Sequence, residues 1–204
     1  MSHLKHATPE HPIQELLTRR WSPYAFSDRT VSADDLRSLF EAARWAASSY
    51  NEQPWSYIVA TRDNAAEFEK LLSCLVEPNQ AWAKAAPVLA LGCTSLRFVL
   101  NHKPNAAAVH DLGLASASLT IEAVARGLDV HQMIGILPDR AREVFTIPEG
   151  SEAYTALAIG YHGERADLPA AYADRDRAPR QRKPLSEFVF GDGWGKAAPF
   201  VKVP

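Results

Sequence analysis

The segment Ala47-Ser48-Ser49-Tyr50-Asn51-Glu52-Gln53-Pro54-Trp55 separates a predicted helix from a predicted strand. Before it, residues 32–47 have apolar side chains at helical spacing, namely Leu36, Leu39, Phe40, Ala43 and Ala47. After it, residues 55–60 are aromatic and β-branched, which is typical of a buried strand. Two hydroxyls, two amides and a proline lie between them. Such residues form an ordinary turn, or they hold the polar edge of a flat ligand.

The rest of the chain alternates predicted helices with predicted strands. Further helices are predicted at residues 13–20, 64–75, 110–127 and 138–145, and further strands at residues 86–91, 130–136 and 154–161. Ser32 is the expected N-cap of its helix, and Gly127 is the expected stop of the long one. The Pro78-Asn79 pair predicts a turn. Because alanine, glycine and serine cover residues 110–127, we expect that helix to be buried on most sides.

Composition limits the function classes. A chain of 204 residues with 47% hydrophobic content favours one domain, and its net charge of −2 argues against a general nucleic-acid binder. Cys74 and Cys93 lie in apolar surroundings and predict buried thiols in a reducing compartment. Residues 112–121 are too few to span a bilayer, and no signal peptide is visible, so we predict a cytoplasmic protein without membrane contact. Histidines in residues 1–12 are irregularly spaced, which favours a disordered tail over a metal site.

The segment at residues 48–55 resembles a known family motif. Ser48-Ser49-x-Asn51-x-Gln53-Pro54-Trp55 resembles the Ser-Ser-x-Asn-x-Gln-Pro-Trp motif of the nitroreductase family of flavin enzymes, and other matching pieces follow in order from about residue 13 to residue 189. The resemblance implies an α+β fold with a central, mostly antiparallel sheet packed by helices over residues 13–163. It also implies an extended C-terminal arm, residues 164–204, that is exchanged in a homodimer. Within this arm, residues 191–204 are expected to form a loose tail.

The same resemblance implies a set of contacts to flavin mononucleotide (FMN). The matching residues are Arg20, Trp21, Ser22, Ser48, Ser49, Asn51, Asn79, Met133, Ile134, Gly135, Arg180 and Arg182. The family motif implies phosphate binding for the arginines, and backbone contacts to the flavin ring for residues 133–135. Trp21 and Tyr24 depart from the motif, because the family commonly has cations there.

Simple physical chemistry supports part of this assignment and offers alternatives. A guanidinium can give two parallel hydrogen bonds to phosphate oxygens, which suits Arg20, Arg180 and Arg182 to an anionic ligand. The alternative for Arg20 is an ordinary interaction with the end of the helix dipole. The alternative for residues 180–183 is a solvated run of charge.

The implied activity is oxidoreduction. No Gly-x-Gly-x-x-Gly follows a strand, which favours FMN over a dinucleotide flavin and disfavours a dedicated nicotinamide site. We therefore expect NADH or NADPH to deliver hydride transiently, and a nitro-aromatic, quinone or similar acceptor to remove it in a ping-pong mechanism. Other flavin reactions and a non-catalytic flavin-binding protein stay open as alternatives.

No catalytic side chain is identified. The chain has no zinc-protease, nucleophile-elbow or phosphate-loop motif. His110 and Asp111 are adjacent on a predicted helix and are expected to point in different directions, which argues against a dyad. Residues 97–105 predict an irregular loop of the kind that shapes a substrate entrance.

Overall fold

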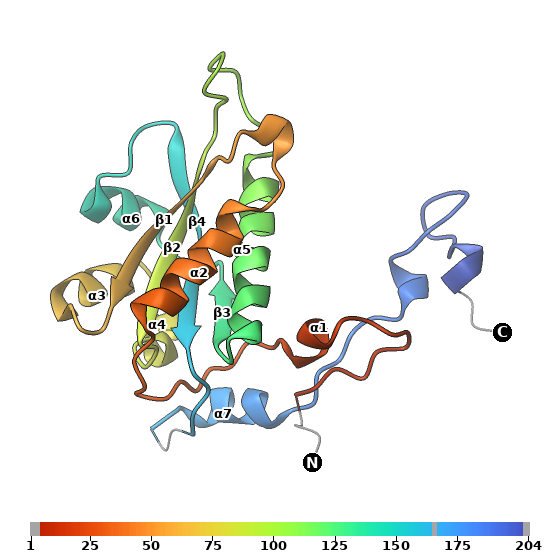
Figure 1. Cartoon of the computed structure of the whole chain (residues 1–204), viewed down its shortest axis with the longest axis horizontal. Helices are drawn as coiled ribbons and strands as arrows, with labels where there is room; N and C mark the ends of the chain where they lie inside the picture. Colours follow the sequence, from red (N-terminus) through yellow and green to blue (C-terminus); the bar gives the residue numbers. More distant parts are fainter. Residues whose placement is uncertain (1–4, 165–166, 202–204) are drawn as a thin grey trace.

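The computed structural model describes residues 5–164 and 167–201. Its centre is a four-stranded antiparallel sheet in the order β1-β2-β4-β3 (Figure 1). The strands are β1 (Trp55–Thr61), β2 (Val88–Ser95), β3 (Asp129–Met133) and β4 (Ser151–Gly160). The helices are α1 (Glu15–Arg19), α2 (Ala33–Arg44), α3 (Ala65–Leu72), α4 (Glu77–Ala83), α5 (Ala108–Ala125), α6 (Pro138–Phe145) and α7 (Ala170–Arg177). The predicted α+β class and the antiparallel sheet are confirmed.

Helices cover both faces of the sheet, which explains why its central strands are apolar on both sides. In β2, Val88 and Ala90 pack with α2 and α5, whereas Leu89 and Leu91 face the core formed with α3, α4 and α6. β4 alternates in the same way. Cys74 and Cys93 are buried as free thiols, as predicted, in the core formed with α3, α4 and α6.

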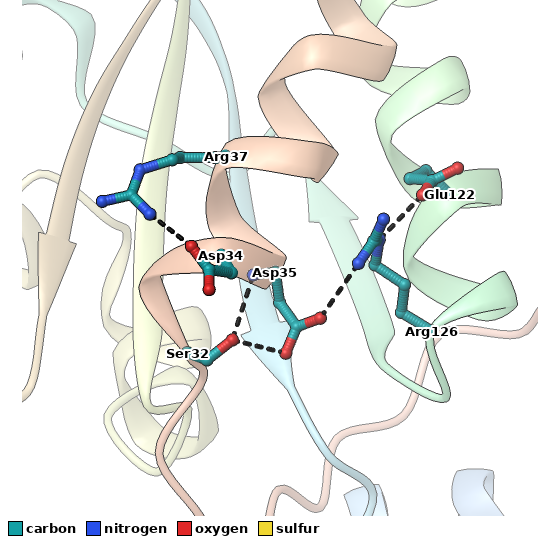
Figure 2. A network of polar contacts seen from close by, with 6 residues as sticks. All are labelled: Ser32, Asp34, Asp35, Arg37, Glu122 and Arg126. Atoms are coloured by element: carbon teal, nitrogen blue, oxygen red, sulfur yellow. Dashed lines mark hydrogen bonds and ion pairs between the residues drawn. The ribbon is translucent and has the colours of Figure 1, made fainter.

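Polar contacts fix the start of α2 against the end of α5 (Figure 2). The Asp35 backbone N–H donates to Ser32 Oγ at 3.0 Å, which confirms the predicted N-cap. The Ser32 hydroxyl donates in turn to the Asp35 carboxylate at 2.7 Å, and this bond lowers the Asp35 pKa. Arg126 bridges Asp35 to Glu122, so the crossing of α2 and α5 is specified by charge as well as by packing.

Three local predictions differ from the structure. Residues 77–83 form α4 rather than a turn, because a proline fits the first turn of a helix, where its missing N–H is not needed. Residues 170–177 of the expected extended arm form α7. The tail predicted from residue 191 is paired through a bridge between Phe190 and Ala197, while residues 202–204 lie outside the described part.

The segment before α1 loops away from the sheet alongside the arm that follows α7, and the arm continues beyond this loop (Figure 1). Residues 1–4 lie outside the described part. Residues 1–12 were predicted to form a disordered tail, but Lys5 within that range is buried, with only 6% of its surface exposed. The C-terminal arm keeps Phe188, Trp194 and Phe200 exposed, at 57%, 95% and 79%. Exposed large apolar side chains that lie near one another are typical of interaction surfaces.

No helix within residues 5–164 and 167–201 combines the length and the apolar character needed to cross a membrane.

Candidate functional site

Three of the predicted arginines lie close enough to repel one another. Burial lowers the pKa of Arg20, and the charges of Arg180 and Arg182 lower it further. Arg20 donates to Ser22 Oγ at 3.1 Å, and Arg180 donates to the carbonyls of Lys5 and Thr18. In the described part of the chain, none of the three forms an ion pair with a carboxylate within 4.0 Å. Such a cluster suits a multiply charged anion such as a phosphate.

The Asp129 carboxylate lies near enough to Arg20 to influence its pKa, and burial disfavours the ionised form of this carboxylate. Burial raises the pKa of Asp129 to about 6, although His162, Arg20 and Arg19 each act to lower it. Ionised Asp129 raises the Arg20 pKa, but it offsets at most one of the three guanidinium charges, so the cluster stays net positive.

A pH dependence follows from Asp129. Its folded pKa of about 6 lies above the unfolded value of 3.8, so its contribution to stability is present below the unfolded pKa and is lost as pH rises through the folded one. Relative to Asp129→Asn, the flavin-free wild type should lose up to about 2–3 kcal/mol between about pH 4 and about pH 7. Urea unfolding across that range measures the difference, and a difference that does not change with pH would contradict it.

Residues 48–53 of the Ser-Ser-x-Asn-x-Gln motif, here called the motif loop, form a constrained loop. Ser48 Oγ accepts from the Gln53 N–H at 3.0 Å, and the Gln53 side chain donates to the Asn51 carbonyl. Tyr50, Asn51 and Gln53 all have positive φ angles of 50–55°. Backbone held in this sparsely populated region is common at ligand-binding sites.

A buried carboxylate that the sequence analysis did not assign holds this loop in place. Asp111, at the start of α5, is 1% exposed and accepts from the Ser49 N–H at 3.0 Å. Its other oxygen lies 3.0 Å from Nδ1 of His110. The expectation that these neighbours point apart was therefore wrong, because the exposed imidazole folds back onto the carboxylate. The sequence signal available for Asp111 was an acid in the first turn of a helix that is otherwise mostly apolar.

Asn79 and the end of β3 meet in space. The Asn79 amide donates to the Gly135 carbonyl at 3.0 Å. A Cβ atom on Gly135 would lie 2.4 Å from that amide, so a larger residue here would displace the Asn79 side chain. Met133 is buried, but Ile134 is 86% exposed. The N–H groups of Ile134 and Gly135 have no acceptor among the described residues, and they are available to a ligand's polar edge.

The two motif departures have distinct environments. The Trp21 side chain is 8% exposed and lies against His162, with the Lys5 ammonium 5.2 Å from its ring. The buried Trp21 ring leaves the residue's backbone as the part that a cofactor could contact, and its predicted role in cofactor binding stays a prediction. Tyr24 packs among aromatic residues, and its hydroxyl accepts from Arg175 at 3.2 Å.

Within one chain, these residues form two separate groups. Ser49 is bonded to Asp111 at the first turn of α5, whereas Arg20 lies near Asp129, just beyond its last turn. Figure 1 shows the motif loop and α1 at opposite ends of this helix. The 18 residues of α5 span about 27 Å at a rise of about 1.5 Å per residue. The structure thus brings the arginines together and Asn79 to Gly135, but it does not bring the arginines to the motif loop.

The loop at residues 96–105 lies against the motif loop. The rings of Tyr50 and Phe98 are 5.9 Å apart, and the Glu52 carboxylate accepts from the Val99 N–H. The loop closes as a short hairpin through an Arg97–Pro104 bridge, which is more regular than predicted. Val99 and Leu100 at its tip are 75% and 91% exposed.

Comparison with known proteins identifies the family. The model of the Nitroreductase family matches residues 17–161. This chain belongs to the Nitroreductase family. It is 28% identical to the major NAD(P)H-flavin oxidoreductase of Aliivibrio fischeri, over 88% of this chain and 98% of that protein. It is also 28% identical to a putative NADH dehydrogenase/NAD(P)H nitroreductase of Archaeoglobus fulgidus, over 78% of this chain and 90% of the relative.

Solved structures of this family share the fold. A crystal structure described as an oxidoreductase containing FMN superposes with a TM-score of 0.87 at 32% identity, over 95% of this chain and 98% of the other. The nitroreductase-like fold implied by the sequence motif is thus confirmed.

Proposed function

We propose that this chain is an FMN-dependent NAD(P)H oxidoreductase that reduces nitro-aromatic, quinone or similar acceptors by a ping-pong mechanism. The observation that carries the proposal is the cluster of Arg20, Arg180 and Arg182, which has no carboxylate ion pair in the described part of a chain of this family. Its relatives include proteins named for NAD(P)H-flavin oxidoreduction and a structure described as containing FMN.

The binding site proposed here is shared between two copies of the chain. One FMN cannot reach both ends of α5 in a single chain, because the helix is longer than the flavin with its ribityl phosphate. A two-fold pairing of antiparallel α5 helices would place the motif loop of one copy beside the arginines of the other. Ser48, Ser49 and Asn51 of one chain would then complete the site that Arg20, Arg180 and Arg182 begin in its partner.

The exposed side of α5 supports this arrangement. Val109, Gly113, Leu114 and Ala117 are exposed along one stripe of the helix, and Ile121 is half-buried beside them. A shallow hollow next to Ala117 is lined by Ala47, Leu114, Ser118, Ile121 and Glu122. Small and apolar residues let two helices approach closely, so this stripe suits a second copy of α5. The exposed aromatic residues of the arm support the proposed exchange between the two copies.

The chain's own residues bind and orient. The arginines hold the phosphate, and the N–H groups of Ile134 and Gly135 are positioned to bond the polar edge of the ring. FMN, when bound, supplies the hydride-transfer chemistry. A positive charge from Arg20 near the ring would stabilise its anionic reduced form. The exposed apolar tip formed by Val99 and Leu100, which follows the Phe98 ring that contacts Tyr50, favours flat aromatic or quinone-like acceptors.

An absorption spectrum before and after addition of a nicotinamide donor tests the activity. The purified protein is expected to carry the yellow flavin spectrum, and NADH or NADPH should bleach it when oxygen is excluded. A nitro-aromatic or quinone added afterwards should restore the colour, as a ping-pong mechanism requires. Flavin that stays oxidised with both donors would contradict the proposed activity and favour a non-catalytic flavin-binding protein.

A further inference from the structure

Lys5 is buried although it carries a charge. Its side chain is 6% exposed, and its ammonium donates to the Arg175 carbonyl at 2.6 Å and to the Ala178 carbonyl. These carbonyls belong to the last turn of α7 and its C-cap, where a cation satisfies acceptors that have no partner within the helix. Burial lowers the pKa of Lys5, whereas the nearby Asp176 carboxylate raises it.

Two charged residues of the C-terminal arm, Asp176 and Arg180, lie near Lys5. Asp176 accepts from the backbone N–H groups of Tyr24 and Ala25, which anchors α7 to the loop after α1. The charge of Arg180 acts in the opposite direction to that of Asp176 and lowers the Lys5 pKa. The Lys5 ammonium also lies 5.2 Å from the Trp21 ring centre, within the range of a cation–π contact.

The C-terminal arm also donates hydrogen bonds back to the N-terminal segment. Arg180 donates to the carbonyl of Lys5 at 3.1 Å and to that of Thr18 at 2.9 Å. The Ala7 N–H also donates to Thr18. The side chain of Lys5 thus holds the helix that precedes Arg180, while its backbone holds the Arg180 guanidinium itself.

We propose that Lys5 is a positioning residue of the phosphate site, because it holds Arg180 beside Arg20. This inference rests on the proposed FMN function. It predicts an effect that is specific to the phosphate: Lys5 should matter for FMN and should not matter for riboflavin, which has the same ring and no phosphate.

Flavin titrations of the full-length apoprotein test this role. Lys5→Met should raise the dissociation constant for FMN about tenfold, the size expected for one charge-assisted contact, and should change that for riboflavin by less than about twofold. Lys5→Arg should stay within about threefold of wild type for FMN, because it keeps the cation. Lys84→Met, an exposed lysine at the end of α4, is the charge-matched control and should bind both flavins as wild type does.

The outcomes separate this inference from the proposed function. Unchanged FMN affinity in Lys5→Met, or an equal loss for FMN and riboflavin, would overturn the positioning role while wild-type binding stood. A wild type that bound no FMN would overturn both. Lys5→Gln replaces Lys5→Met if the latter does not fold. Trypsin cleavage of the apoprotein after Arg180 should be faster in either variant, since the arm loses its attachment, and an unchanged rate would contradict the inference.

Discussion

Ala117→Arg is expected to be a folded monomer that no longer retains FMN. Ala117 lies in the exposed stripe of α5, where the side chain has room in one chain but would meet the same helix of a second copy. An unpaired charge buried in such an interface costs about 3 kcal/mol or more. Because each proposed site draws on both chains, loss of the dimer should weaken FMN binding at least about a hundredfold. Analytical ultracentrifugation and flavin titration measure the two effects.

A matched control keeps this prediction specific. Ala66→Arg makes the same substitution at an exposed alanine of α3, far in sequence from α5, and should remain a dimer with wild-type FMN affinity. Circular dichroism should show both variants folded. An Ala117→Arg protein that stays dimeric and yellow would exclude the α5 stripe as the interface.

Arg182→Ala should weaken FMN binding without lowering the stability of the flavin-free protein. The Arg182 side chain is exposed, and its charge acts against Arg20 and Arg180, so its removal relieves repulsion. In the proposed site, the same guanidinium would give the phosphate a charged hydrogen bond worth about 1.5–3 kcal/mol. The FMN dissociation constant should therefore rise about 10–100-fold, while the apoprotein's melting temperature stays the same or rises.

Arg177→Ala supplies the comparison for Arg182→Ala. Arg177 is an exposed arginine of α7 whose partner is Asp174 at 3.9 Å, outside the arginine cluster. Its loss should leave FMN affinity unchanged. If Arg182→Ala lowered the apoprotein's melting temperature as strongly as it lowered flavin retention, Arg182 would be a structural residue.

Much of the fold follows from local patterns. The strands read from aromatic and β-branched runs all occur, and the caps at Ser32 and Gly127 lie where short-range chemistry puts them. α4 was missed because the Pro78-Asn79 pair is compatible both with a turn and with a helix's first turn. α7 was missed because its apolar periodicity is weak, and its position depends on Lys5 and Asp176 rather than on a buried stripe.

The candidate site was only partly predictable, for a different reason. Matching a motif placed Arg20, Arg180 and Arg182 in one group, and the structure puts them within electrostatic reach of one another. The contacts of Asp111 with Ser49 and of Lys5 with Ala178 join residues 62 and 173 positions apart. No local pattern contains such pairs, because tertiary packing creates them.

A complementation experiment tests the shared site most directly. Arg182→Ala removes a proposed phosphate contact, and Asn51→Asp changes the motif loop while keeping a residue type that tolerates its φ of 55°. Each variant alone should bind FMN poorly. Co-expressed with different affinity tags, they should form mixed dimers in which one site has both wild-type halves and the other has both substitutions.

The number of tightly bound FMN molecules per dimer in the co-expressed mixture distinguishes a site shared between two chains from a site within one chain. If each site joins the arginines of one chain to the motif loop of the other, random pairing restores about a quarter of the wild-type sites, and purified mixed dimers hold about one tight FMN per dimer. If both groups of residues acted within one chain, every site in the mixture would carry one substitution. No tight binding would then return, and the shared site proposed here would be wrong.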